Sequence, residues 1–218
     1  MANWQGGIRV NAFASGGALP AAVRNTTVSG FVHLADWYTT FAGIAGVSAV
    51  DDRAAAAGLP PVDGLDVWPL LSGANLTSPR TEIPAGSDGV EANLKNGTQV
   101  QALIRADGYK LIIGELDQNI WTGPKYPNQT TKWDDTNYHC GVPSTPPLGK
   151  GGCLFNIFDD PTEHNDISAQ KPNIVKEMYA RILEIQQTSF TPNRGSDDGT
   201  ACVAALDTWG GFYGPFLP

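Results

Sequence analysis

The sequence has few charged residues. Asp, Glu, Lys and Arg make up 17% of its 218 residues, and 22 acidic against 14 basic side chains give a formal net charge of −8. Nucleic acids and anionic membranes are bound by clustered Lys and Arg, which are scattered here, so the composition argues against such partners. No apolar run is long enough to span a membrane, and the first residues lack the basic start and apolar run of a signal peptide.

The common motifs of catalysis are missing too. The chain has no Gly-x-Ser-x-Gly nucleophile elbow and no phosphate-binding P-loop. His33, His139 and His164 are its only histidines, and none stands at zinc-ligand spacing from another His or Cys. The carboxylate pairs Asp51-Asp52 and Asp134-Asp135 carry no mark of an acid and base couple. Motifs and residue spacing therefore identify no catalytic residue and no metal ligand.

An acidic cluster stands out at Asp159, Asp160, Glu163 and Asp166. It lacks the alternating oxygen ligands, the central Gly and the terminal Glu of an EF-hand calcium loop. We predict a solvated turn after a strand, capped by its own Asp side chains.

Cysteine is scarce, with three residues. Cys140 and Cys153 bracket a loop rich in Pro and Gly, and a disulfide that closes a loop of this size contributes about 3 kcal/mol. We predict this disulfide, which leaves Cys202 either as a buried free thiol or with a partner in sequence outside the chain.

Four N-glycosylation sequons begin at Asn25, Asn75, Asn96 and Asn128. Ordinary usage of Asn, Ser and Thr would give roughly two. The excess is typical of an extracellular or lysosomal protein.

Gly and Pro are abundant, at 25 and 16 residues, which is typical of a loop-rich globular chain. Residues 8–13 alternate apolar and polar side chains, which predicts a half-buried strand. Asp107-Gly108 between two β-rich runs predicts a hairpin. The other predicted elements are helices at 35–47 and 174–190, helical turns at 54–57 and 67–71, strands at 100–106, 110–114 and 154–158, a long loop at 117–152 and an extended segment at 191–218. We expect the helix at 174–190 to cover one face of a small antiparallel sheet.

Six segments stand in an informative order. They are Trp4-Gln5-Gly6-Gly7-Ile8-Arg9-Val10, the run from His33 to Phe41, the run from Val62 to Trp68, Ala102-Leu103-Ile104-Arg105, Tyr109-Lys110-Leu111-Ile112 and the run from Leu154 to Asp166. This order resembles the C-terminal part of the sulfatases, especially the arylsulfatase B-like group. The corresponding family elements are Trp-Glu-Gly-Gly-x-Arg, His-x-x-Asp-x-x-Pro-Thr, Asp-Gly-x-Asp-Val-Trp, an Ile-Arg…Trp-Lys-Leu hairpin and an Asp-Pro-x-Glu turn.

The resemblance implies a fold class: an α+β fragment of the alkaline-phosphatase-like α/β sulfatase fold. Residues 1–80 would hold the last strand and helix of the large domain. Residues 81–218 would form the small C-terminal subdomain, an antiparallel sheet packed on one long helix.

The resemblance also implies a parent enzyme, a secreted or lysosomal sulfuric ester hydrolase of the arylsulfatase type that acts on a sulfated small molecule or glycan. Its nucleophile would be a formylglycine made within Cys/Ser-x-Pro-x-Arg, and a calcium ion held by Asp and Asn would bind the sulfate. Ser78-Pro79-Arg80 lacks the spacing of that motif. We therefore expect an inactive isolated chain and an N-terminal catalytic domain outside it. A sulfate-contacting Lys immediately precedes the family position aligned with Met1, so we expect Met1 to be an internal methionine.

Gln5, Gly6, Gly7 and Arg9 match the family segment beside the substrate pocket, with Gln5 in place of the usual Glu. They would shape the floor of the active site; a plain Gly-Gly turn followed by a salt-bridged Arg is the alternative. Two other functions stay open: a phosphate-ester or phosphonate hydrolase of the same superfamily, and a stand-alone secreted binding module.

Overall fold

The computed structural model describes residues 3–86, 100–116, 138–141, 151–189 and 198–215. Asn96, Asn128, Asp134-Asp135 and most of the predicted loop at 117–152 lie outside these ranges. The α+β class is confirmed.

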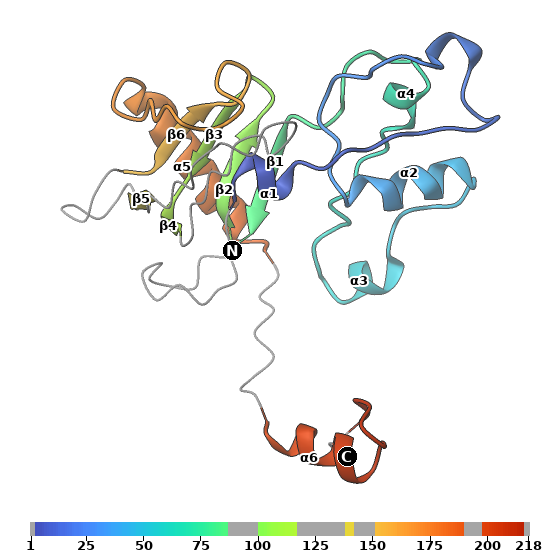
Figure 1. Cartoon of the computed structure of the whole chain (residues 1–218). Coiled ribbons are helices and arrows are strands. Elements are labelled where there is room, and N and C mark those ends of the chain that lie inside the picture. The colour runs from blue at the N-terminus through green and yellow to red at the C-terminus, as the bar shows by residue number, and fades with distance from the viewer. Residues whose placement is uncertain (1–2, 87–99, 117–137, 142–150, 190–197, 216–218) are drawn as a thin grey trace, which may run out of the picture.

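The centre of the fold is a four-stranded antiparallel sheet in the order β1-β2-β3-β6 (Figure 1). Its strands are β1 (Glu82–Gly86), β2 (Val100–Arg105), β3 (Tyr109–Ile112) and β6 (Cys153–Asn156). The last three confirm the strands predicted from the sequence. A second pair, β4 (Gly114–Leu116) and β5 (Tyr138–Gly141), forms a two-stranded sheet.

The turn at Asp107-Gly108 joins β2 to β3, as predicted for a hairpin. Gly108 has φ +90°, a conformation that side chains with a Cβ rarely adopt. A Cβ at this position would also lie 2.5 Å from the Phe158 ring. Both the backbone angle and the space therefore require glycine here.

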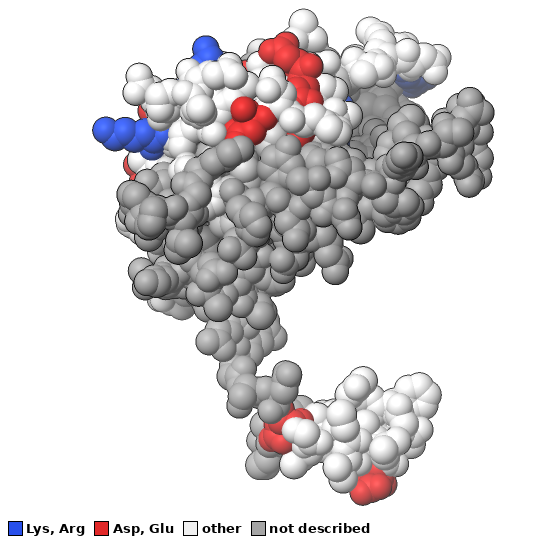
Figure 2. Space-filling model, turned by 60° about the vertical axis from the view of Figure 1, so that its left-hand side comes forward, with Lys and Arg blue, Asp and Glu red and all other residues white. Residues whose placement is uncertain are grey.

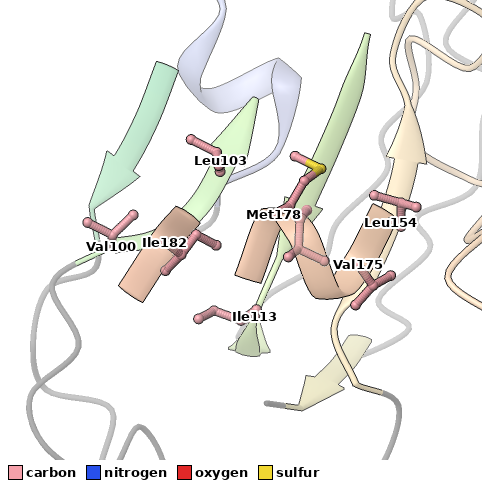
Figure 3. Packing of buried hydrophobic residues seen from close by; sticks show 8 residues of the cluster. Val100, Leu103, Ile113, Leu154, Val175, Met178 and Ile182 are labelled. Atoms are coloured by element: carbon pink, nitrogen blue, oxygen red, sulfur yellow. The ribbon is translucent and has the colours of Figure 1, made fainter. Parts of the chain in front are cut away.

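Helix α5 (Pro172–Gln186) covers one face of the sheet, which confirms the predicted helix and its role. Pro172 lies in the first turn, where its missing N–H costs nothing. Val175, Met178 and Ile182 point from α5 onto Leu103 and Leu154 of the strands (Figure 3). This layer is the larger of the two apolar clusters.

The opposite face of the sheet carries the second apolar cluster: Ala102, Ile112, Cys140, Cys153 and Phe155, with Trp4 and Ala85 packed against it. Cys140 and Cys153 form the predicted disulfide. Cys202 is unpaired and exposed, so the first of the two alternatives for it, a buried free thiol, is wrong.

Residues 3–80 form short helices joined by loops. They are α1 (Gln5–Ile8), the 3-10 turn η1 (Ala21–Val23), α2 (Asp36–Ile44), α3 (Asp52–Ala56) and α4 (Trp68–Leu71). The last three confirm the predicted helix at 35–47 and the helical turns at 54–57 and 67–71. Asp51 begins α3 by accepting hydrogen bonds from the N–H groups of Arg53 and Ala54. Figure 1 shows α2, α3 and α4 beside the sheet, on neither of its faces.

Two predictions from the sequence are wrong. Residues 8–13 are not a strand: Ile8 ends α1, residues 9–13 have no regular structure, and Val10 and Phe13 are exposed. A strand needs a hydrogen-bonded neighbour, and no described strand pairs with this segment. Residues 191–218 are not wholly extended, because α6 (Thr200–Asp207) lies within them, apart from the sheet in Figure 1. Alternation of side chains at 8–13 does not show whether a strand has a neighbour to pair with. The Gly-rich and aromatic composition of residues 191–218 does not reveal the short Ala-rich helix α6 within them.

No helix among the described residues is long and apolar enough to cross a membrane. Among the described residues on the face drawn in Figure 2, Lys and Arg are isolated and form no basic patch.

Candidate functional site: two buried polar junctions

The first junction is a buried ion pair between β3 and the acidic turn. Lys110 Nζ lies 2.5 Å from Glu163 Oε1, and the two side chains are 0% and 2% exposed. Glu163 was predicted to belong to a solvated turn, and that prediction is wrong for this residue. It is right for Asp160, whose Oδ2 accepts a hydrogen bond from the N–H of Asn165 at the surface.

The second oxygen of Glu163 binds the N-terminal segment. Its Oε2 accepts a hydrogen bond of 2.6 Å from the backbone N–H of Gln5, where α1 begins. Glu163 has φ +58°, a backbone conformation that is uncommon for a residue with a side chain. The turn thus holds Glu163 at an unfavourable φ, and its carboxylate contacts both Lys110 and the N–H of Gln5.

Charge and burial act against each other at this junction. Burial lowers the pKa of Lys110, because it disfavours the charged ammonium, while Glu163 partly offsets the effect. Removing either partner would leave a buried charge without compensation. Lys110 and Glu163 can therefore be buried as charged groups only when both are present.

Two further contacts fix the residues before α1 across the sheet face opposite α5. Asn3 Nδ2 donates hydrogen bonds to Gln101 Oε1 at 2.8 Å and to the carbonyl of Gly86 at 3.1 Å. The Trp4 and Phe155 rings meet edge to face with centroids 5.6 Å apart. Gln101 faces Asn3 because the β1-β2 register shifts between Ala85 and Gly86.

Of the four predicted pocket residues, the structure brings only Gln5 to this junction. Gly6, Gly7 and Arg9 are exposed, and a Cβ added to Gly6 would meet no atom within 4 Å. Nothing in the described packing requires glycine at position 6.

The second junction surrounds Asp36 at the start of α2. Its carboxylate accepts hydrogen bonds from the Arg80 guanidinium and from the backbone N–H groups of His33 and Leu65. Burial of Asp36 favours its neutral acid, but these hydrogen bonds, led by that of Arg80, outweigh it and lower the pKa. Burial and the nearby Arg80 lower the pKa of His33.

The same junction orders residues 63–67. Arg80 Nη2 donates to the carbonyl of Asp63 at 2.8 Å, and Thr40 Oγ1 accepts from the N–H of Val67 at 3.0 Å. Gly64 lies so close to α2 that a Cβ would be 2.3 Å from the carbonyl oxygen of Ala35. Two segments that are 29 residues apart are held together through Asp36.

Neither junction resembles a metal centre. In the described part of the chain, no three His, Cys, Asp or Glu side chains are grouped so that they could hold a metal ion. In the acidic turn, Asp166 Oδ1 accepts from the N–H groups of Leu154 and Ser168, and Glu163 binds Lys110. These oxygens serve the protein's own donors, so the described residues do not fit a calcium ion.

Comparison with known proteins supports the resemblance. No protein-family model matches the chain. The mouse (Mus musculus) protein arylsulfatase J is 29% identical over 228 aligned residues, which cover 98% of this chain and 34% of that protein. The chain is related to the C-terminal part of the sulfatases. It spans about a third of the length of the sulfatase that it matches.

A solved structure from Bacteroides thetaiotaomicron is also similar. It is a sulfatase from a locus described in the metabolism of multiple glycosaminoglycans, and it is 19% identical with a TM-score of 0.39 over 70% of this chain and 24% of that chain.

The two junctions bring the sulfatase-like segments into contact with one another. The first joins three of them, the segments that contain Gln5, Lys110 and Glu163, and the second joins two more, those that contain Asp36 and Leu65. No motif in the sequence marks Lys110 or Arg80 as a site residue. A signal was present for the first, because Lys110 is a lone charge within the β-rich run at 109–112.

Proposed function

We propose that these 218 residues are the C-terminal region of a sulfuric ester hydrolase whose formylglycine nucleophile and calcium site are contributed by residues outside this chain. The observation that carries the proposal is the convergence on Glu163. Three sulfatase-like segments far apart in the sequence meet at one buried carboxylate: Glu163 is 158 positions from Gln5 and 53 positions from Lys110.

In this proposal the small sheet supports one wall of the substrate pocket. Gln5, Gly6, Gly7 and Arg9 lie beside the pocket, and the Glu163 carboxylate fixes the start of their segment. The exposed backbone at Gly6 and Gly7 leaves space for the catalytic region or for the sulfated small molecule or glycan. The proposed division places residues 1–80 with the large α/β domain and residues 81–218 in the C-terminal subdomain.

The isolated chain is proposed to be inactive. Cleavage of a sulfate ester develops negative charge on the leaving oxygen, which cations and a general acid must stabilise. The two least exposed cations of the described ion pairs, Lys110 and Arg80, are already paired with Glu163 and Asp36. We propose a secreted or lysosomal location for the whole enzyme.

The first test is the reading frame that precedes the codon for Met1. A Cys/Ser-x-Pro-x-Arg motif there supports a sulfatase. A Thr or Ser nucleophile without that motif would instead indicate phosphate-ester or phosphonate chemistry.

The second test is activity. The purified chain, supplied with calcium and a formylglycine-generating enzyme, is expected to hydrolyse neither an aryl sulfate nor an aryl phosphate. A chimera of mouse arylsulfatase J in which this chain replaces the matched third should hydrolyse the aryl sulfate. Turnover by the isolated chain that a single substitution abolishes would contradict the proposal, and an inactive but fully folded chimera would favour a stand-alone module.

A further inference from the structure

Two of the four N-glycosylation sequons lie in the described part of the chain, and both are on the surface. The first is Asn25-Thr26-Thr27 and the second is Asn75-Leu76-Thr77. Every residue of both sequons is exposed. A folded protein can carry an N-linked oligosaccharide only where the Asn lies at the surface, because the sugar is bulky and solvated. Both sequons satisfy this condition.

The first sequon forms a tight turn. Asn25 has φ +58°, a left-handed conformation in which Asn is several-fold enriched. Thr26 Oγ1 donates a hydrogen bond of 2.7 Å to the carbonyl of Val23. The sequon itself requires the hydroxyl of Thr27. The residue that fixes the turn and the residue that the sequon needs are therefore different.

The second sequon follows directly on helix α4. The backbone N–H of Asn75 donates a hydrogen bond of 2.9 Å to the carbonyl of Pro69 in that helix. Asn75 Oδ1 accepts a hydrogen bond of 3.0 Å from the backbone N–H of Thr77, which forms an Asx turn. This turn uses the amide oxygen of Asn75 and not its nitrogen, the atom to which a sugar is attached.

The two sequons lie on one surface, because the segments that hold them run side by side. Gly73 lies so close to Val23 that a Cβ added to it would be 2.6 Å from Val23 Cγ1. Each sequon begins two positions after this contact, within about 7 Å of chain. Beyond the sequons, Ser78 Oγ donates a hydrogen bond of 2.6 Å to the carbonyl of Phe31. Contacts on both sides of the sequons thus hold the two segments together.

We propose that Asn25 and Asn75 both carry N-linked oligosaccharides, and that the surface they share stays open to solvent in the whole enzyme. This inference rests on the secreted or lysosomal location in the proposed function. The catalytic region cannot pack against a bulky, solvated sugar. It therefore contacts residues 3–80 on another surface.

The donor of the sugar is a lipid-diphosphate-linked oligosaccharide. In the transfer, Asn Nδ2 forms a bond to C1 of the first sugar, and the bond between C1 and the diphosphate oxygen breaks. The lipid diphosphate leaves and takes up the proton that Nδ2 loses. The reaction is a group transfer and needs no oxidant or reductant.

Heavy-oxygen labelling measures the occupancy of each sequon. The probe is the arylsulfatase J chimera described above, secreted from eukaryotic cells through an added leader peptide. Peptide N-glycosidase F in heavy-oxygen water converts each glycosylated Asn to a labelled Asp. Trypsin then separates the two sequons, because residues 25–53 and 54–80 are tryptic peptides with a single Asn each. We expect label at both positions in at least half of the molecules, and none at Asn165, which is exposed but outside a sequon.

Substitutions test each position separately. Thr27→Ala should abolish the label at position 25 alone, and Thr77→Ala should abolish the label at position 75 alone. Thr26→Ala is the matched control: it removes the hydrogen bond to Val23 and keeps the sequon, so both labels should remain. The glycosidase also tests the open surface, because it should release both sugars from the folded chimera as completely as from the denatured one.

Lack of label at either position, in cells that glycosylate a co-secreted control protein, would overturn the proposal. So would sugars that are released only after denaturation, because the surface would then be covered. Aryl-sulfate turnover separates this inference from the proposed function. Label at both positions without turnover would contradict the proposed function and leave the oligosaccharides standing, whereas turnover without label would contradict this inference alone.

Discussion

The two halves of this chain distribute their apolar side chains in opposite ways. Of the 20 buried hydrophobic residues among those described, 16 lie at or after Val100, and Leu19, Ala42, Val67 and Leu70 are the other four. Of the 20 exposed large hydrophobic residues, 13 lie between positions 10 and 76. The sheet with α5 has a core of its own, whereas residues 3–80 have their apolar residues mainly on the outside.

The difference shows that local order and a hydrophobic core are separable. Residues 3–80 form short helices, one of which is capped by Asp51, and the Asp36 junction joins two of their segments by hydrogen bonds. Burial of apolar surface is nevertheless the main favourable term in folding. The sheet region is therefore expected to be the more stable part, and each prediction below tests that contrast.

The largest effect is expected at the link between the two regions. Glu163→Ala leaves Lys110 buried without a partner and frees the N–H of Gln5, so the free energy of unfolding of the sheet should fall by about 3–5 kcal/mol in urea denaturation. The control Glu177→Ala, on the exposed side of α5, should change it by less than about 0.5 kcal/mol. If the double variant Lys110→Met/Glu163→Leu is as unstable as Glu163→Ala, the explanation by an unpaired charge is wrong.

Core truncation should affect the two regions differently. Met178→Ala opens a cavity between α5 and the sheet and should cost about 2–5 kcal/mol. Leu70→Ala removes a buried side chain from the smaller region. It should leave hydrogen exchange at the Leu103 and Leu111 amides unchanged, because these belong to the sheet core. Faster exchange at both amides in Leu70→Ala would show that the two regions unfold as one.

Acid should disorder the Asp36 junction before the sheet. The pKa of Asp36 is lowered in the folded state, so its carboxylate stabilises the fold above the unfolded value of about 3.9, and this contribution is lost as pH falls through the lower folded pKa. Amide exchange at Leu65, followed by NMR across that range, should accelerate while exchange at Leu111 does not. Asp36→Asn should abolish this pH dependence; if it persists, another group titrates.

The smallest effect is expected at the surface. Arg181 on α5 pairs with Glu82 and Glu184, and these carboxylates raise the pKa of Arg181. The guanidinium is 47% exposed, so solvent screens the interaction and Arg181→Ala should cost no more than about 1 kcal/mol in urea denaturation. A loss close to that of Met178→Ala would mean that the surface pairs contribute as much as the core.

Prediction from the sequence succeeded where the cause is local. The Asp107-Gly108 turn, the long helix α5 and the helical turn at 67–71 each depend on residues within one element. It failed at residues 8–13, because alternation describes a side-chain pattern and a strand also needs a partner. It failed at Glu163 for a similar reason, because a carboxylate in a turn rich in Asp is expected to be solvated unless a distant cation meets it.

The sequence by itself determined the relationship to the sulfatases, the β hairpin, the long helix and the absence of the known catalytic motifs, because these depend on residue order and short-range patterns. Only the tertiary structure decided that Lys110, Glu163 and Gln5 meet and that Asp36 binds Arg80. Those contacts join residues far apart along the chain. Their partners are chosen by packing and charge in three dimensions, which residue order does not encode locally.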